Sequence, residues 1–423
     1  MEKIEVMAPA GSYESLQAAI KSGADSVYFG VQQLNMRARS SINFTLEDLK
    51  NIVSICKEKN VKTYLALNTL MYDHDMKIMR KVADAAKSAG ITAIIISDLA
   101  ALQYANSIGL EVHMSTQTNV ANYETVKFYS KFADVIVLAR ELTLKQIKDI
   151  HENIKKDQLK GPSGELVRLE AFAHGAMCVA VSGRCYMSIG QYNASPNRGA
   201  CLQECRRAYT VIDKETGYEM DIDNEYVMSS KDMCTIGFID KMIDAGITVL
   251  KIEGRGRAPE YVHTVTKCYR EALDSIFDGT YSKEKIDAWI TKLKTVYNRD
   301  FWDGFYMGRK IDSWSGSYGS QATTEKFYLG RIINYFKKAG VAEIHLESGE
   351  INIGDKLLIT GVTTGVVEGK IDSIFVDEKP VERAGKGQTV TIPVPETLRK
   401  NDRFYIVKDR LPEEKLVQIE KKN

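Results

Sequence analysis

The sequence predicts an α/β protein in which a (β/α)8 barrel of the TIM type is followed by a small all-β barrel domain. Short runs of β-forming residues alternate with helical patterns through the first part of the chain, which is typical of parallel strands joined by right-handed crossovers. From about position 327 the pattern changes to short strands broken by turns. An open doubly wound sheet is the alternative architecture for the first part.

Eight runs are predicted to be the barrel strands. They are Ile4–Met7, Asp25–Phe29, Val61–Leu67, Ile91–Ile96, Glu111–Met114, Asp134–Leu138, Leu166–Ala173 and Thr248–Ile252. Segments such as Ser12–Ser22 and Thr45–Lys59 have helical spacing, and Thr45 is a suitable N-cap with acidic residues in the first turn. Eight such units in about 250 residues are the usual content of a (β/α)8 barrel.

The expected domain organisation has three parts. We expect the barrel over residues 1–300, a linker over 301–326 and the C-terminal β-barrel domain over 327–410. A long insertion over 175–243 follows the seventh strand. Because this insertion leaves the C-terminal end of a strand, it lies where barrels of this type carry their active sites.

The composition excludes several classes of protein. The chain has 423 residues, of which 44% are hydrophobic and 27% charged, as in soluble globular proteins. Its 57 Lys and Arg residues balance 56 Asp and Glu residues, so it is not a strongly basic nucleic-acid coat, although local basic patches remain compatible with this balance. With no secretory pattern and no apolar run long enough to span a bilayer, we expect a cytoplasmic protein without a membrane partner.

Alternation along the strands predicts which side chains point into the barrel. The inward set comprises His113 on the fifth strand, Arg168, Glu170, Phe172 and His174 on the seventh, and Lys251 and Glu253 on the eighth. Buried charges are costly unless paired, so a structural ion-pair network is one interpretation. In the functional interpretation, His174 beside the insertion transfers protons, and Glu170 orients it or balances its charge.

Two pairs of arginines follow strands that flank the first strand. Arg37 and Arg39 come after the second strand, and Arg255 and Arg257 come after the eighth. Guanidinium groups in such loops fork onto carboxylates or phosphates. Arg37, Arg39 and Arg255 are therefore candidates to line one anion-binding pocket, and solvated surface arginines are the alternative.

The cysteines give the strongest chemical signal. Cys178, Cys185, Cys201 and Cys205 fall within twenty-eight residues, enough for a tetrahedral zinc ion or an iron–sulfur cluster. In a reducing compartment such a group favours metal over disulfides. Only the Cys201–Cys205 spacing suits a zinc knuckle, so the wide first gap favours a 4Fe–4S cluster. Cys234 is a rival fourth ligand, and inert buried cysteines are the remaining interpretation.

Other catalytic motifs give no support to hydrolysis. The sequence contains no nucleophile elbow of the Gly-x-Ser-x-Gly type, no phosphate-binding loop and no dinucleotide fingerprint.

A stretch of nineteen residues resembles the signature of peptidase family U-32. It reads EAFAHGAMCVAVSGRCYMS from Glu170 to Ser188. Further similar segments are Ala8–Gly11, Gly23–Asp25, Ser115–Gln117, Lys251–Arg255, Asn298–Arg299 and a C-terminal β-domain typical of many members. The signature is specific for the family and much less so for the substrate.

The resemblance implies a more definite activity. The family name records an early collagenase assignment, whereas the better-understood relatives are oxygen-independent hydroxylases with a 4Fe–4S cluster on the signature cysteines. The chain is most similar to the branch that converts the wobble uridine of tRNA to 5-hydroxyuridine with prephenate. Neighbouring branches act on ribosomal RNA cytidine or on ubiquinone precursors. Carried over residue by residue, the cluster ligands would be Cys178, Cys185, Cys201 and Cys205.

The expected partners follow from this resemblance: the anticodon region of tRNA, the iron–sulfur assembly machinery and a candidate homologous partner subunit. Prephenate is a dicarboxylate that needs cationic side chains, and Arg37, Arg39 and Arg255 are candidates. Aromatic and arginine side chains beside the cysteines would hold an unstacked base; these are Tyr186, Tyr192, Arg206 and Arg207. The alternatives are a collagenase-like peptidase of undefined catalytic type and a non-enzymatic RNA-binding accessory subunit.

Overall fold

The first region closes into a barrel in the computed structural model, which describes residues 4–39, 42–181, 184–219, 228–308, 314–316 and 319–410. The barrel strands are β1 (Glu5–Pro9), β2 (Ser26–Phe29), β3 (Lys62–Leu67), β4 (Ala93–Ile96), β5 (Glu111–Met114), β6 (Val135–Val137), β7 (Arg168–Gly175) and β9 (Ile247–Ile252). Each of β1 to β6 pairs in parallel with the next barrel strand, and β9 pairs in parallel with both β7 and β1. The predicted (β/α)8 barrel is confirmed, and this closure excludes the open sheet.

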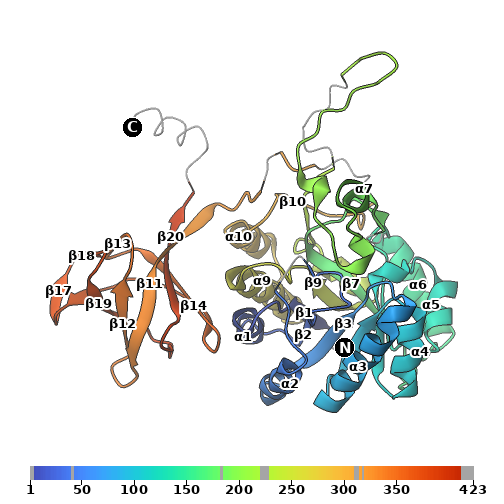
Figure 1. Cartoon of the computed structure of the whole chain (residues 1–423), viewed down its shortest axis with the longest axis horizontal. Helices are drawn as coiled ribbons and strands as arrows, with labels where there is room; N and C mark the ends of the chain where they lie inside the picture. Colours follow the sequence, from blue (N-terminus) through green and yellow to red (C-terminus); the bar gives the residue numbers. More distant parts are fainter. Residues whose placement is uncertain are drawn as a thin grey trace.

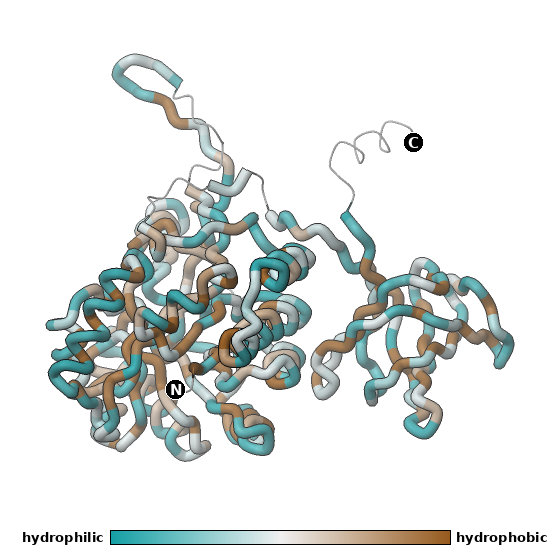
Figure 2. The backbone as a smooth tube through the Cα atoms, turned by 180° about the vertical axis from the view of Figure 1, so that it is seen from behind, coloured by the Kyte–Doolittle hydropathy of each residue, from teal (hydrophilic) through white to brown (hydrophobic). Residues whose placement is uncertain are grey.

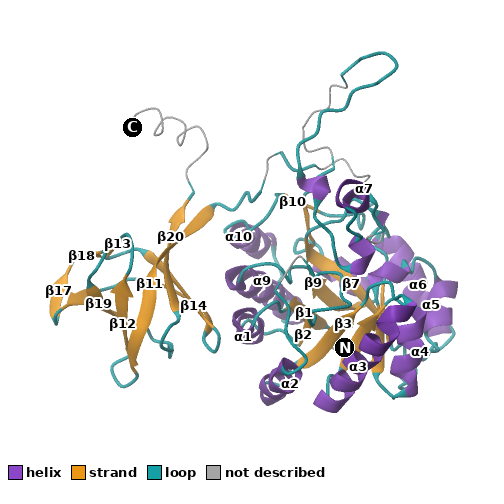
Figure 3. Ribbon diagram, viewed as in Figure 1, coloured by secondary structure: helices purple, strands orange, loops and turns teal. Residues whose placement is uncertain are grey.

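Helices surround the barrel strands, as Figures 1 and 3 show. They are α1 (Tyr13–Lys21), α2 (Asp48–Glu58), α3 (Met76–Ala89), α4 (Leu99–Ser107), α5 (Tyr123–Tyr129), α6 (Leu144–Lys156), α8 (Ile239–Asp244), α9 (Pro259–Phe277) and α10 (Lys283–Leu293). A continuous apolar layer joins them to the strands, and Figure 2 shows hydrophobic stretches within the barrel and within the C-terminal domain. Thr45 is not the N-cap of α2, because its amide and hydroxyl both donate to Asp48 Oδ2 at 2.8 Å in the turn before the helix.

The insertion after β7 covers the C-terminal end of the barrel. It contains α7 (Met187–Tyr192), 3-10 turns at Pro196–Arg198 and Glu204–Arg206, and β8 (Asp232–Cys234), which is antiparallel to β7 and beside β10 (Phe301–Trp302). The predicted linker therefore begins with a strand of the barrel's own sheet. Side chains fasten the insertion: Arg206 donates to the carbonyl oxygens of Met177 and Ser230, and Arg198 pairs with Asp75.

The C-terminal domain is an antiparallel β structure. Its strands are β11 (Thr324–Phe336), β12 (Val341–Leu346), β13 (Glu350–Asn352), β14 (Lys356–Gly361), β15 (Gly365–Lys370), β16 (Ile374–Val376), β17 (Lys379–Val381), β18 (Arg383–Gly385), β19 (Thr389–Pro393) and β20 (Arg403–Asp409). Eight of them form one sheet, β13 and β18 form a second, and an apolar core fills the domain.

The β-domain packs directly on the barrel. Leu358 and Val366 belong to the apolar core of the barrel rather than to that of their own domain. At Gly365 a Cβ atom would lie 2.9 Å from Gln17 Cβ, so the turn into β15 approaches α1 as closely as a glycine permits. Within the described part of the chain, no helix is both long and apolar enough to cross a membrane.

Candidate active site: a cysteine-lined cavity at the barrel mouth

A cavity of about 220 Å³ opens at the C-terminal end of the barrel. The strands supply its floor through Tyr28, Phe172 and Lys251, and the insertion supplies its upper wall. Seven cationic side chains line it against three acidic ones. The cations are Arg37, Arg140, Arg206, Lys251, Arg255, Arg257 and Arg299, and the acids are Glu141, Glu204 and Glu253. The cavity therefore favours an anionic occupant.

The four predicted ligand cysteines all line this cavity, and all are free thiols. Burial raises the pKa of Cys205, negative charge on Cys178, Cys201 and Cys185 raises it further, and Arg206 opposes these effects. Cys205 therefore lies within electrostatic range of the other three sulfur atoms. In the described ranges, no group of three or more His, Cys, Asp or Glu side chains is arranged to hold a metal ion.

The donor set nevertheless fits an iron–sulfur cluster. Four cysteine thiolates are the usual ligands of a 4Fe–4S cluster, and here four thiols from one insertion face one space. The rival ligand Cys234 does not line the cavity; it lies on β8, where its sulfur accepts a hydrogen bond from the Tyr269 hydroxyl at 3.9 Å. Burial raises the pKa of Cys234 to about 11. Cys234 therefore does not share the cavity with the other four cysteines.

His174 does not point into the barrel, which corrects the orientation predicted from alternation. The pairing of β7 with β9 shifts between Phe172 and His174, so that Phe172 pairs with Lys251 and His174 with Ile252. A bulge of this kind exchanges the two faces of a strand. Phe172 lines the cavity, whereas His174 packs against α9 with its Nδ1 3.4 Å from the Tyr269 hydroxyl. Burial lowers the pKa of His174 to about 3.

Glu170 does point into the barrel, as alternation predicts, but its partners differ from those expected. Its Oε1 lies 2.6 Å from Lys251 Nζ and its Oε2 lies 3.4 Å from His113 Nδ1. Burial raises the pKa of Glu170, but Lys251 and His113 outweigh this and hold the pKa below its ordinary value. Glu170 is therefore an ionised group that balances Lys251, and its ion-pair partners among the described residues are Lys251 and His113 rather than His174.

Of the three arginines predicted to share a pocket, two line the cavity and the third lies outside it. Arg37 lines the cavity and donates to Glu253 Oε1 at 2.7 Å, and Glu253 raises its pKa. Arg255 also lines the cavity, is 6% exposed and has no hydrogen-bond partner for Nη1 among the described residues. Arg39 is exposed and lines a neighbouring cavity on the outer side of the insertion. Two of the three can thus reach the same ligand.

The end of β2 is shaped around Arg255. A Cβ atom at Gly30 would lie 2.4 Å from Arg255 Nη1 and 2.7 Å from the side chain of Asn35. A side chain at position 30 would therefore displace the guanidinium group or the Asn35 side chain from its present place. Burial lowers the pKa of Arg255, as expected for a cation held away from water.

Several lining residues were missed by sequence reasoning. Arg140 follows the three-residue strand β6, and its guanidinium group lies 3.8 Å from the centre of the Phe172 ring. Asn68 follows β3 and donates to Gln117 Oε1 at 3.3 Å. Both are polar residues directly after a barrel strand. That position could have identified them as candidate active-site residues from the sequence.

Of the side chains expected to hold a base, Arg206 alone is among the described lining residues of the cavity. Arg206 is largely buried and bonds the carbonyl oxygens of Met177 and Ser230, so it fastens the insertion. Tyr186 and Tyr192 are exposed, and the Arg207 guanidinium group lies 5.7 Å from the Tyr192 ring centre.

These features define a barrel protein with a cationic, cysteine-lined cavity at the end where barrel enzymes carry out their chemistry. A sequence profile described as peptidase family U32 matches residues 11–316, and the chain belongs to this family. The expected family is thereby confirmed.

Individual relatives carry two kinds of name. A collagenase of Porphyromonas gingivalis is 57% identical over 401 residues, covering 95% of this chain and 97% of the relative. An uncharacterized protease of Methanocaldococcus jannaschii is 41% identical and covers 97% of this chain and 100% of the relative. A tRNA hydroxylation protein P of Helicobacter pylori is 32% identical and covers 72% of this chain and 71% of the relative. The names of the relatives thus divide between proteolysis and RNA hydroxylation.

Proposed function

We propose that this protein is an iron–sulfur enzyme that hydroxylates the wobble uridine of tRNA to 5-hydroxyuridine, with prephenate as co-substrate. The observation that carries the proposal is the gathering of four free cysteines, and of no histidine among the described lining residues, around a cationic cavity. Relatives named as tRNA hydroxylation proteins supply the reaction class.

Cys178, Cys185, Cys201 and Cys205 would hold a 4Fe–4S cluster, which supplies redox or substrate-activating chemistry when bound. Arg206 favours the thiolate form of Cys205, because its charge lowers the pKa that burial raises. Its bonds to two loop carbonyls keep that charge in place without any contribution from the sulfur atoms. The chain thus provides the ligands and a fixed counter-charge.

Arg255 is the candidate for binding a carboxylate of prephenate. Its Nη1 is buried and lacks a hydrogen-bond partner among the described residues, so an anionic ligand would satisfy a group that the protein leaves unsatisfied. Arg37 is a weaker candidate, because Glu253 already neutralises it. The second carboxylate can reach Arg140 or Lys251, which line the same cavity.

Peptide hydrolysis is the second candidate function, because two relatives of high coverage are named collagenase and protease. The cavity offers it little support. Ser115 and Ser188 line the wall, but the described lining contains no histidine to activate a serine or cysteine nucleophile. His174 lies outside the cavity and burial lowers its pKa to about 3.

Anaerobic purification followed by iron and sulfide analysis tests the cluster. We expect about four iron atoms per chain in the wild type and loss of iron in each Cys→Ala variant at positions 178, 185, 201 and 205. Cys234→Ala is the matched control, because Cys234 lies outside the cavity, and it should retain iron. Iron loss in Cys234→Ala with retention in Cys205→Ala would contradict the assignment.

Mass spectrometry of tRNA from a strain lacking the gene tests the reaction. Wobble bases derived from 5-hydroxyuridine should disappear and return with the wild-type gene, but not with Cys205→Ala. Unchanged tRNA would exclude the proposed reaction. Peptide cleavage that persists in cluster-free protein and in Cys205→Ala would favour the peptidase, and tRNA binding without turnover would favour an accessory subunit.

A further inference from the structure

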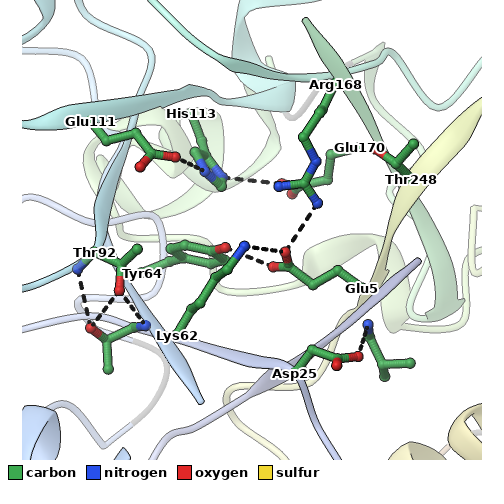
Figure 4. Close-up of polar contacts among 12 residues, drawn as sticks. Glu5, Asp25, Lys62, Tyr64, Thr92, Glu111, His113, Arg168, Glu170 and Thr248 are labelled. Carbon is green, nitrogen blue, oxygen red and sulfur yellow. Dashed lines mark hydrogen bonds and ion pairs between the residues drawn. The ribbon is translucent and has the colours of Figure 1, made fainter. Parts of the chain in front are cut away.

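A line of ionisable groups passes through the barrel from the end opposite the cavity. Glu111 Oε1 lies 3.5 Å from His113 Nε2, His113 Nδ1 lies 3.4 Å from Glu170 Oε2, and Glu170 Oε1 lies 2.6 Å from Lys251 Nζ. Figure 4 shows the first three members in sequence, reaching across the lumen from β5 to β7. The outer member is accessible to water and the inner members are buried: the Glu111 side chain is 40% exposed, those of His113 and Glu170 are 0% exposed, and that of Lys251 is 6% exposed.

Apolar side chains enclose the line. Met7, Ile95, Val135 and Val249 form a separate apolar cluster inside the barrel. The Tyr64 ring lies 4.4 Å from the ring of His113, centre to centre. Both nitrogens of His113 and Glu170 Oε2 have no hydrogen-bond partner among the described residues, so the contacts of His113 with Glu111 and with Glu170 are ion-pair contacts that must shorten before a proton passes. The line is thus a row of ionisable groups between apolar side chains.

Lys251 connects this path to the cavity. It lines the cavity floor, with its Nζ 4.7 Å from the ring centre of Tyr28 and 5.6 Å from that of Phe172. Its ion-pair partner within the described residues is Glu170. A protonated amine placed between two aromatic rings at the floor of an anion-binding cavity can donate a proton to a bound substrate.

We propose that Lys251 is the acid–base residue of the cavity and that Glu111, His113 and Glu170 resupply its proton from the far end of the barrel. The inference depends on the proposed function in one respect: it assumes that this cavity is the catalytic site. His113, Glu170 and Glu111 do not touch the substrate in this proposal, so they are positioning and relay residues.

The proton balance is closed by solvent. Lys251 Nζ donates a proton to the reacting group and becomes a neutral amine. The imidazolium form of His113 gives its Nδ1 proton to Glu170 Oε2, and the Glu170 carboxyl group rotates and delivers that proton to Lys251. His113 is then neutral, with its remaining proton on Nε2. Tautomer exchange moves this proton to Nδ1, and the freed Nε2 takes a new proton from water by way of Glu111, which restores the imidazolium form. No electron moves, and no co-reactant is needed.

The charges that face His113 keep it able to carry a proton. Burial lowers its pKa, but Glu111 on its own strand and Glu170 on β7 outweigh burial and hold the pKa above its ordinary value. Tyr64 on β3 also faces the ring, and Lys62 and Arg168 act on Glu111 from the same end of the barrel. His113 therefore takes up a proton more readily than its burial alone would allow.

The first experiment requires no substrate. In protein labelled with ¹⁵N-histidine, the pKa of His113 should lie above the ordinary histidine value, and Lys251→Met should raise it further, because a nearby cation is lost. His74, whose side chain is 72% exposed, serves as the internal reference. Lys326→Met is the matched control, since Lys326 pairs with Glu260 outside the line. A His113 ring that never titrates, or that ignores Lys251→Met, would overturn the relay whatever the reaction proves to be.

The second experiment separates proton supply from structure. Glu111→Gln and His113→Gln should leave the first turnover unchanged, because Lys251 begins protonated, and should slow repeated turnover by about 100-fold. Lys251→Met should slow both. A purely structural network would lower thermal stability in each variant without separating the first turnover from later ones, and that result would overturn the proposal. A wild-type protein that lacks hydroxylase activity but shows the expected His113 titration would contradict the proposed function and leave the relay supported.

Discussion

The two ends of the barrel contain similar charges that are arranged differently. At the end where the strands begin, Glu5 receives Lys62 at 3.1 Å, Arg168 at 3.0 Å and the Tyr64 hydroxyl at 2.7 Å, so each charge has a partner. At the mouth, Nη1 of Arg255 and Nε of Arg140 have no hydrogen-bond partner among the described residues. Buried polar groups are normally satisfied, so these guanidinium nitrogens are where we expect the proposed anionic ligand to bind.

The largest expected effect on stability comes from Glu5→Gln at the paired end. Removing this carboxylate leaves Arg168 and Lys62 without their common partner and should reduce the free energy of unfolding by about 3 kcal/mol. Urea denaturation measures the change. Lys62→Met should cost less than about 1 kcal/mol, because Lys62 is half exposed. Equal losses in the two variants would contradict the assignment of Glu5 as the centre of the network.

At the mouth, Arg255→Met should weaken ligand binding without reducing stability, the reverse of what is expected for Glu5→Gln. Prephenate affinity should fall by about 10-fold to 100-fold, since a charge-assisted hydrogen bond contributes about 1.5–3 kcal/mol. The free energy of unfolding should be unchanged or higher, because a buried charge without a partner is removed. Calorimetric titration and urea denaturation of the same protein check both halves. Loss of stability without loss of affinity would show that Arg255, like Glu5, stabilises the fold rather than binding a ligand.

Acid should unfold the protein through a carboxylate at each end. Burial raises the pKa of Glu5 and of Glu253, but neighbouring cations outweigh it and lower both from 4.5 to about 2. A carboxyl group whose pKa is lower in the folded than in the unfolded protein adds to the free energy of unfolding. The full contribution is present at any pH above the pKa of the unfolded state. That contribution is lost as the pH falls from about 4.5 towards about 2. Thermal melting over the acidic range should show a decline that Glu5→Gln and Glu253→Gln each reduce in part.

The smallest expected effect comes from Arg39→Ala. Arg39 is exposed and lines the outer cavity, so prephenate affinity should stay within about twofold and stability within about 0.5 kcal/mol of the wild type. The same titration and denaturation measurements apply. A loss comparable to that of Arg255→Met would show that the loop after β2 brings Arg39 into the main cavity when a ligand binds.

The sequence predicted the barrel strands well, because buried parallel strands are continuous apolar runs bounded by helical patterns. It placed Glu170 inside the barrel correctly by alternation. It misplaced His174, since the bulge between Phe172 and His174 depends on pairing with β9 and leaves no local mark. Arg37 and Arg39 are two residues apart, yet they reach different cavities because loop geometry follows no simple period.

The spacing of the cysteines could not decide between Cys205 and Cys234 as the fourth ligand. Their separation depends on where β8 returns to the sheet, and in the structure β8 carries Cys234 behind the cavity, beside Tyr269. Arg140 was missed for another reason: it follows a strand of three residues and belongs to no recognised motif.

The anchoring of the insertion has a consequence for how the protein matures. Arg198 is tied to Asp75, Arg206 to the carbonyl oxygen of Ser230, and the Arg39 amide to the carbonyl oxygen of Gly199. None of these ties involves sulfur. Small zinc domains cannot fold before their metal binds, whereas these contacts need no metal in order to form. If the proposed cluster is bound by the four cysteines, we expect the insertion to keep its structure when the cluster is removed.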